Sequence, residues 1–150
     1  MRFVSVIMLF AFLFSCENAK DGYSKKWRFA LVSPNYSNIH FNNRIQESAS
    51  FNVLQYGYLY NGGGVAIGDI DNDGLDDIYF SSNMASNRLY KNLGNLTFKD
   101  ITESAGVAAN DAWNTGVSMA DFNNDGFLDI YVCRSADAYP ENRKNLLFIN

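Results

Sequence analysis

Two aspartate-rich stretches contain the residues whose types and spacing most directly suggest chemistry. The first runs from Asp69 to Asp77 and the second from Asp121 to Asp129, and both follow the pattern D-x-[D/N]-x-D-G-x-x-D. Calcium prefers about six to eight oxygen ligands, and alternate side chains of a tight loop can bring carboxylates together around one ion. Gly74 and Gly126 stand where such a loop must turn sharply, which suits a residue without a Cβ. The two stretches therefore predict two Ca²⁺ sites.

The predicted ligands occupy equivalent positions in the two loops, with side-chain oxygens at positions one, three, five and nine and a backbone carbonyl at position seven. In the first loop they are Asp69, Asp71, Asp73, Leu75 and Asp77. In the second loop they are Asp121, Asn123, Asp125, Phe127 and Asp129. The first loop offers four carboxylates and the second offers three carboxylates and an amide, so ligand charge predicts tighter binding at the first. Asp76 is expected to be solvated, because it faces away from Asp77 in an extended segment.

An EF-hand loop begins in the same way, but it requires a bidentate glutamate at its twelfth position and a helix on either side. The twelfth position holds Phe80 in one loop and Val132 in the other. The flanking residues are β-branched and aromatic, which favours strands over helices. The helix-loop-helix interpretation therefore fails, and each loop is expected to join two β-strands.

An internal repeat surrounds the loops. Residues 64–80 align with residues 116–132 without a gap, and residues 87–92 align with residues 145–150 after an insertion near residues 134–144. Each repeat is a series of short β-like runs separated by turn residues, which is typical of a propeller blade of about 40 to 50 residues. We predict an all-β fold, a partial β-propeller with about two four-stranded blades of which the second is incomplete.

The aspartate-rich loops resemble those of the FG-GAP or VCBS repeat, the blade of integrin α-chain-like propellers. That resemblance implies that each loop joins the first two strands of a blade and binds Ca²⁺. The chain also resembles exported VCBS-repeat lipoproteins of Bacteroidetes-type bacteria and the propeller part of the cartilage acidic protein family, whose longer members often end in an ASPIC/UnbV domain. The motifs that carry this wider resemblance lie at residues 60–69, 87–92, 98–102, 105–107 and 145–150.

The first sixteen residues differ in composition from the rest of the chain. Arg2 precedes an apolar run from Phe3 to Phe14, which is typical of a signal peptide and shorter than the roughly 20 residues of a membrane-spanning helix. The run ends in a sequence that resembles a bacterial lipobox, so we predict lipidation at Cys16, with cleavage as a plain secretory peptide as the alternative. We expect export and lipid anchoring to the cell envelope, at the outer membrane or cell surface, with membrane contact through this anchor only.

The rest of the chain divides by composition. Residues 17–30 are polar and poor in aliphatic side chains, as expected of a flexible tether. We predict an N-terminal β segment at residues 31–60, the first blade at residues 61–109 and a second, truncated blade at residues 110–150. A blade that stops after its third strand leaves an unpaired sheet edge, so we expect the chain to be a fragment of a larger propeller.

Composition excludes several other functions. The net charge of −4 and the lack of a basic stripe argue against nucleic-acid binding. His40 is expected to be an ordinary polar residue. The glycine run at residues 62–64 lacks the lysine of a phosphate loop, so we expect it to be a flexible approach to the first strand. Cys133 has no disulfide partner once Cys16 carries lipid, and we expect it to be buried in a strand. The many aromatic side chains, Trp113 among them, are expected to fill the core rather than to stack on sugars.

We expect a non-enzymatic calcium-binding module at the cell surface, because the paired carboxylates all have the spacing of metal loops and none resembles a general acid/base pair. The expected partner is an extracellular protein or glycan. A second hypothesis is the scaffold of a cell-surface polysaccharide-processing enzyme whose catalytic region lies downstream. A third is a purely structural piece of a cell-envelope assembly.

Overall fold

The computed structural model describes residues 29–110, 112–135 and 140–150. The predicted signal peptide, the lipidation site at Cys16 and nearly all of the tether lie outside these described residues. The chain divides into two units at Leu31, and the following description concerns the second unit, Val32–Asn150. In the part of the chain that the structure describes, no helix is both long enough and apolar enough to cross a membrane.

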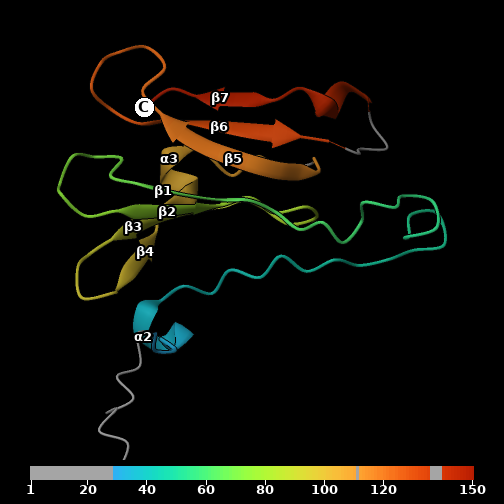
Figure 1. Ribbon diagram of the computed structural model, residues 1–150, viewed down its shortest axis with the longest axis horizontal. Coiled ribbons are helices and arrows are strands. Elements are labelled where there is room, and N and C mark those ends of the chain that lie inside the picture. Colours follow the sequence, from blue (N-terminus) through green and yellow to red (C-terminus); the bar gives the residue numbers. More distant parts are fainter. Residues whose placement is uncertain (1–28, 111, 136–139) are drawn as a thin grey trace, which may run out of the picture. The chain divides into compact units, whose positions relative to one another are not determined.

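The first sheet contains four antiparallel strands in the order β1-β2-β3-β4, so that each strand pairs with its neighbour in sequence (Figure 1). Its strands are β1 (Val65–Gly68), β2 (Asp77–Phe80), β3 (Arg88–Asn92) and β4 (Phe98–Asp100). The strands are rich in β-branched and aromatic residues, which pack well on a pleated surface. The first aspartate-rich stretch forms the connection between β1 and β2.

The second sheet repeats the first three strands of this arrangement. Its strands, in the order β5-β6-β7, are β5 (Asn114–Ala120), β6 (Asp129–Arg134) and β7 (Leu146–Phe148), and a 3₁₀ helix, η1 (Pro140–Arg143), precedes β7. The second aspartate-rich stretch joins β5 to β6. The structure thereby confirms the all-β prediction and fits a partial propeller, and the described strands form no closed barrel.

The strand register shows that the sequence repeat is also a structural repeat. Ile67 pairs with Ile78 in the first sheet, and Met119 pairs with Ile130 at the aligned positions of the second. The buried aspartate that ends each loop follows the same rule, because Asp77 pairs with Gly68 and Asp129 pairs with Ala120. Corresponding residues of the two loops can therefore be compared one by one.

A shared apolar core lies between the two sheets. Its buried members are Tyr79, Leu89, Val107, Ile130 and Val132, which come from both sheets and from the segment after α3 (Thr102–Ala105). Strand β1 packs against β5 across this core, and Figure 1 shows the two strands as neighbours. Burial of these side chains stabilises the pair of sheets through the hydrophobic effect.

Two glycines of the run before β1, Gly63 and Gly64, are closely packed, which corrects the expected flexible approach there. A Cβ at Gly64 would lie 2.9 Å from the carbonyl oxygen of Thr115, and one at Gly63 would overlap the carbonyl group of Ser81. A Cβ at Gly68 would lie 2.6 Å from Cδ1 of Leu128. These glycines therefore allow β1 and the residues before it to approach their neighbours.

The predicted β segment over residues 31–60 was wrong, because the structure forms no strand there. The segment instead contains the one-turn helix α2 (Pro34–Ser37), several turns and one isolated bridge between Ser48 and Phe51. Local polar side chains explain the difference. Ser33 caps α2, and the side chain of Asn52 donates to the carbonyl oxygen of Ser48, so nearby groups satisfy backbone atoms that a sheet would otherwise pair.

Candidate calcium loops

The first loop is folded around the carboxylate of Asp69. One oxygen of this carboxylate accepts the backbone N–H of Asp73 at 3.0 Å, and the other accepts the N–H of Gly74 at 2.8 Å. Asn72 and Gly74 adopt left-handed backbone conformations, with φ of 58° and 86°. Asp73 then accepts the N–H of Leu75 at 3.0 Å. The sharp turn predicted from the glycine is therefore present, and hydrogen bonds to the aspartates hold it.

Asp77 anchors the loop to the sheet. Its side chain is fully buried at the start of β2, where it accepts the N–H of Ile70 at 3.1 Å and that of Asn92 at 2.7 Å. Burial raises the pKa of Asp77, the two N–H donors oppose this, and the charges of Asp71 and Asp73 raise it further. Additional positive charge close to this carboxylate would stabilise its ionised form.

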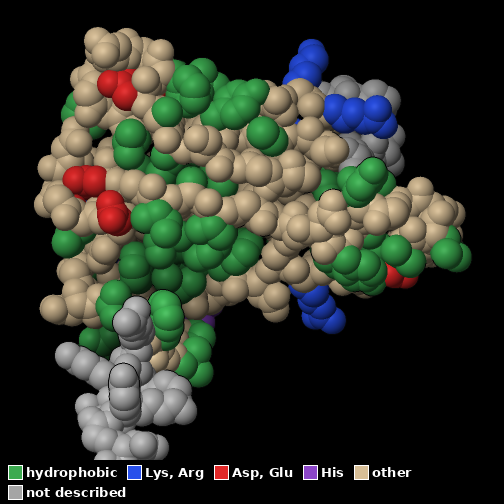
Figure 2. Space-filling model, in the orientation of Figure 1, with side chains coloured by type: hydrophobic (Ala, Val, Ile, Leu, Met, Phe, Trp, Pro, Cys, Tyr) green, Lys and Arg blue, Asp and Glu red, His purple; other side chains and the backbone are tan. Residues whose placement is uncertain are grey.

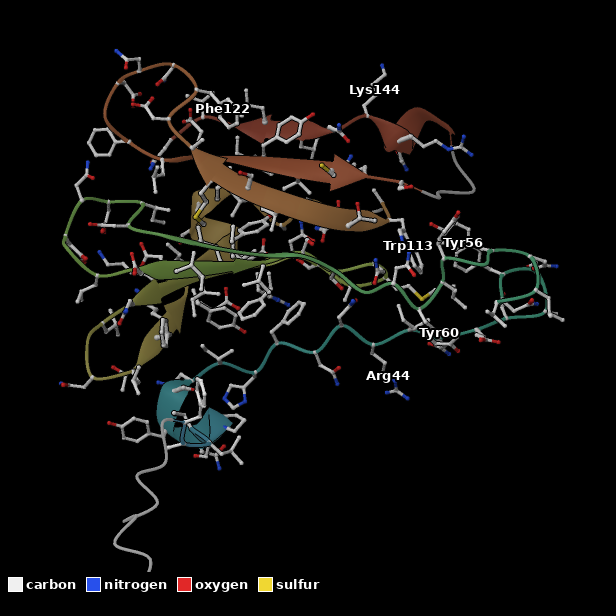
Figure 3. All side chains as sticks on the ribbon, viewed as in Figure 1. Arg44, Tyr56, Tyr60, Trp113, Phe122 and Lys144 are labelled. Carbon is white, nitrogen blue, oxygen red and sulfur yellow. The ribbon has the colours of Figure 1, made fainter. Side chains whose placement is uncertain are left out.

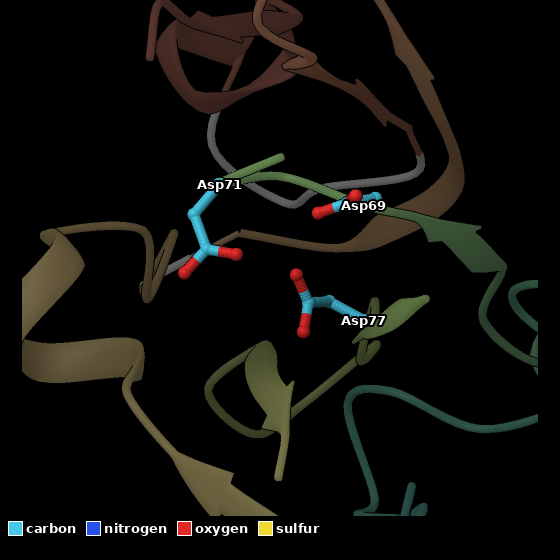
Figure 4. Close-up of side chains that lie close together, drawn as sticks. All are labelled: Asp69, Asp71 and Asp77. Carbon is cyan, nitrogen blue, oxygen red and sulfur yellow. The ribbon is translucent and has the colours of Figure 1, made fainter. Parts of the chain in front are cut away.

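Three of the predicted ligands converge in the first loop. One carboxylate oxygen from each of Asp69, Asp71 and Asp77 lies within 4.8 Å of the others. Figure 4 shows these three side chains close together. Among the described residues this is the one group of three metal-binding side chains that lie so close together. Hard carboxylate oxygens from alternate loop positions fit the ligand preference of Ca²⁺.

Lys91, on β3, supplies a cation to this group of carboxylates. Its Nζ contacts the carboxylate of Asp71 and lies 3.2 Å from Oδ2 of Asp73. Hydrogen bonding to Lys91 lowers the pKa of Asp73, and the bonds to Asp71 and Asp73 raise the pKa of Lys91. The first loop therefore attracts positive charge and already contacts one positively charged group.

The second loop repeats the hydrogen-bond framework of the first. Asp121 accepts the backbone N–H groups of Asp125 at 3.1 Å and Gly126 at 2.9 Å. The bond from Gly126 is the main cause that lowers the pKa of Asp121. Asp129 is fully buried and accepts the N–H groups of Phe122 and Asn150, each at 2.9 Å. Every bond has its counterpart in the first loop.

Loop position three, which holds Asp71 in the first loop and Asn123 in the second, distinguishes the two loops. In the second loop, Asn123 accepts the N–H of Asp125 at 3.1 Å, and its side-chain amide donates to Oδ2 of Asp125 at 2.7 Å. Asp125 corresponds to Asp73 of the first loop. Asp125 therefore accepts from the amide of Asn123, whereas Asp73 contacts the ammonium group of Lys91. The residue of the second repeat that aligns with Lys91 is Ile149.

The two loops also contact each other. The side-chain amide of Asn72 donates to the carbonyl oxygen of Gly126 at 3.1 Å, and that of Asn150 donates to the carbonyl oxygen of Ile70 at 2.6 Å. Figure 2 shows acidic side chains along the edge of the molecule where the loops lie in Figure 1. Direct hydrogen bonds therefore couple the conformations of the two loops.

The predicted carbonyl ligands remain predictions, because the structure gives only the N–H bonds of these residues. Leu75 and Phe127 each donate to the aspartate two positions earlier, at 3.0 and 2.9 Å. Asp76 is exposed, as expected, and its carbonyl oxygen accepts from the side chain of Asn92 at 2.9 Å. The contributions of Lys91 and Asn92 were missed from the sequence, although the alignment of residues 87–92 with 145–150 marks both positions.

Residues 69–132, from the first residue of the first loop into β6, match the family of FG-GAP-like repeats. This match over part of the chain confirms the resemblance to FG-GAP-like repeats. The chain is also similar to cartilage acidic protein 1 from Xenopus tropicalis, with 43% identity over 72 residues, and to that from Mus musculus, with 42% over 69 residues. These matches cover 47% and 46% of the chain and 11% of each relative, so the chain spans about a tenth of their length.

Other residues singled out in the sequence lie away from the loops. His40 is exposed, and its backbone N–H donates to the hydroxyl of Tyr90 at 3.3 Å. Cys133 is a free, half-buried residue of β6, less buried than expected. Trp113 is buried and makes edge contacts with Phe51 and Tyr56, which fits the expected packing role.

Proposed function

We propose that this chain is a non-enzymatic binding module whose two aspartate-rich loops hold Ca²⁺. The observation that carries the proposal is the convergence of Asp69, Asp71 and Asp77 within 4.8 Å of one another. Asp73 and the Leu75 carbonyl would complete the first set of ligands. The second set would consist of Asp121, Asn123, Asp125, the Phe127 carbonyl and Asp129.

Calcium would act here through stability. Clustered carboxylates repel one another, and a bound divalent cation replaces that repulsion with attraction. The loops join β1 to β2 and β5 to β6, so ions bound there would hold two hairpins in their folded register. A ligand that binds only the folded state stabilises it by about 2.7 kcal/mol when its concentration is a hundred times Kd.

Thermal unfolding with and without calcium tests this proposal. We expect the Tm measured in EDTA to rise by about 10 °C when millimolar Ca²⁺ is supplied in excess. Asp71→Asn should reduce the rise, because it removes one of the three converging carboxylates. Asp76→Asn is the matched control, since Asp76 is exposed in the same loop and is not a predicted ligand. An unchanged Tm in the parent chain at millimolar Ca²⁺ would refute the metal site.

A pocket away from the loops supports a neutral saccharide as the ligand of the module. It has a volume of about 450 Å³ and is lined by Tyr56, Tyr58, Asn61, Gly62, Gly63, Gly64, Trp113, Thr115, Gly116 and Ser135. No charged side chain is among these described lining residues. Aromatic rings offer apolar faces to the C–H groups of a sugar, and hydroxyl and amide groups can bond to its hydroxyls. Tyr58 is the exposed ring of this set, whereas buried Trp113 packs edge-on against Tyr56 (Figure 3) and supports the pocket from behind.

Binding to a panel of neutral oligosaccharides, followed by calorimetry, tests the pocket. Tyr58 is 66% exposed and lines it, so Tyr58→Ala should weaken binding about tenfold. Tyr60→Ala is the matched control, because Tyr60 is 64% exposed, lies close in sequence and does not line the pocket. Equal loss of binding in both variants would argue against the pocket, and capture of proteins without glycans would favour a protein partner.

We also propose export and lipid anchoring, supported by the apolar run and lipobox-like sequence of residues 1–16. Metabolic labelling with a fatty acid in the native cell type should modify the parent chain and leave Cys16→Ala unlabelled. Labelling of both proteins, or of neither, would contradict an anchor at Cys16.

A further inference from the structure

Lys91 distinguishes the two loops in a way that the number of ligands does not. Its ammonium group contacts the carboxylate of Asp71 and lies 3.2 Å from that of Asp73. Both carboxylates are proposed calcium ligands, so a cation that binds there meets a positive charge belonging to the protein itself. The side chain of Lys91 is 29% exposed, which leaves it room to move aside when a stronger competitor arrives.

The second loop has an aliphatic residue at the corresponding position. Asn92 and Asn150 donate equivalent backbone hydrogen bonds to the buried aspartates of their own loops, at 2.7 and 2.9 Å. These two bonds align the third strands of the repeats, so Ile149 corresponds to Lys91 in space as well as in sequence. In the part of the chain that the structure describes, the ion pairs with loop carboxylates all belong to the first loop.

We infer that Lys91 is a tethered competitor of Ca²⁺ at the first loop, and that the second loop therefore binds Ca²⁺ at a lower concentration. This inference rests on the proposed calcium function. The single charge of Lys91 cancels the one additional carboxylate of the first loop. A divalent ion must also break two ion pairs at the first loop, whereas at the second it must break the hydrogen bond that the Asn123 side-chain amide donates to Asp125. The order expected from the number of carboxylates is thereby reversed.

The amide signals of Gly74 and Gly126 can report on the two loops separately in an NMR titration of the full chain with CaCl₂. Each N–H donates to the first aspartate of its own loop, at 2.8 and 2.9 Å. In the parent chain we expect the Gly126 signal to reach half-saturation at the lower calcium concentration. Lys91→Met removes the charge and keeps most of the stem, so it should lower the half-saturation concentration of Gly74 about tenfold.

Two further variants serve as controls for the charge. Lys91→Arg retains a cation and should leave the half-saturation of Gly74 within roughly twofold of the parent value. Ile149→Lys places an ammonium at the second loop and should raise the half-saturation of Gly126 about tenfold. This variant tests the same competition and leaves the native contacts of Lys91 in place. Ile149 is 55% exposed, so a longer polar side chain can be accommodated there.

The possible results separate this inference from the proposed function. An unchanged Gly74 half-saturation in Lys91→Met, with both loops titrating normally, would overturn the role of Lys91 and leave the calcium function standing. Earlier saturation of Gly74 than of Gly126 in the parent chain would also overturn it. If neither signal moved at millimolar Ca²⁺, both the inference and the calcium function would fail.

Discussion

The two aspartate-rich loops have nearly the same backbone framework and differ in how their charges are balanced. In both, the first aspartate accepts two N–H groups within the loop, and the ninth is buried and accepts two more. The first loop balances its additional carboxylate with Lys91, whereas the second has an amide at Asn123 and an aliphatic residue at Ile149. Under the proposed calcium function, the metal affinity of each loop would depend on the neighbouring strand as well as on the loop itself.

The largest effect should come from the buried aspartates, and it should be the same in both loops. Asp77→Ala and Asp129→Ala each leave two backbone N–H groups without their acceptor, so each should lower the free energy of unfolding by about 3 kcal/mol. Chemical denaturation in EDTA isolates this framework effect from metal binding. Asp76→Ala is the control and should change stability by less than about 0.5 kcal/mol.

Unequal losses of stability in Asp77→Ala and Asp129→Ala would contradict a shared hydrogen-bond framework. If Asp77→Ala were costly and Asp129→Ala neutral in EDTA, the second loop would not depend on the framework that its hydrogen bonds indicate. Equal losses would confirm that the loops share one architecture and differ mainly in charge.

A smaller effect should distinguish the two sheets behind the loops. Tyr79 is fully buried; its hydroxyl donates to the carbonyl oxygen of Val107 at 2.7 Å and accepts from Asn87 at 2.9 Å. Burial raises the pKa of Tyr79 to about 12, so this hydroxyl keeps its proton. Tyr131, at the aligned position, is only partly buried and accepts from Asn145 at 2.7 Å.

We therefore expect Tyr79→Phe to lower the free energy of unfolding by about 1.5 kcal/mol and Tyr131→Phe to lower it by about 0.5 kcal/mol. Urea denaturation of the two variants checks the difference. Equal costs would mean that the second sheet protects its tyrosine as well as the first does, contrary to the exposure in this structure.

The smallest effect concerns the contact between the loops. Asn72→Ala removes the hydrogen bond to the carbonyl oxygen of Gly126 and should cost about 0.5 kcal/mol beyond the cost of alanine in a left-handed conformation. Asn124→Ala is the matched control, because Asn72 and Asn124 have φ of 58° and 60°. Denaturation curves of the two variants measure the difference, and identical curves would show that this bond contributes nothing to stability.

The sequence predicted the strands and loops because their signals are local and occur twice. Short runs of β-branched and aromatic residues predicted the strands of the first sheet, and the aligned repeat predicted those of the second. The segment at residues 31–60 was mispredicted, since its serines and asparagines form turns that a search for apolar runs does not detect. The contact of Lys91 with Asp71 crosses 20 residues of chain, and only folding brings the two together.

The repeat itself contained a clue to this difference between the loops. Aligning residues 87–92 with residues 145–150 places Lys91 over Ile149, a change from a charged to an aliphatic residue in otherwise matching sequence. The significance of that change depends on which way the side chain points. In the structure, Lys91 contacts the carboxylates of the first loop, which a one-dimensional alignment cannot show.

Calorimetric titration of the full chain with CaCl₂ tests directly whether the two loops bind Ca²⁺. We expect two calcium ions to bind per chain, in two steps of unequal affinity. Asp71→Asn should weaken one step and Asp125→Asn the other. No binding at millimolar Ca²⁺, or a single ion whose affinity neither substitution changes, would contradict the assignment of the two loops as calcium sites.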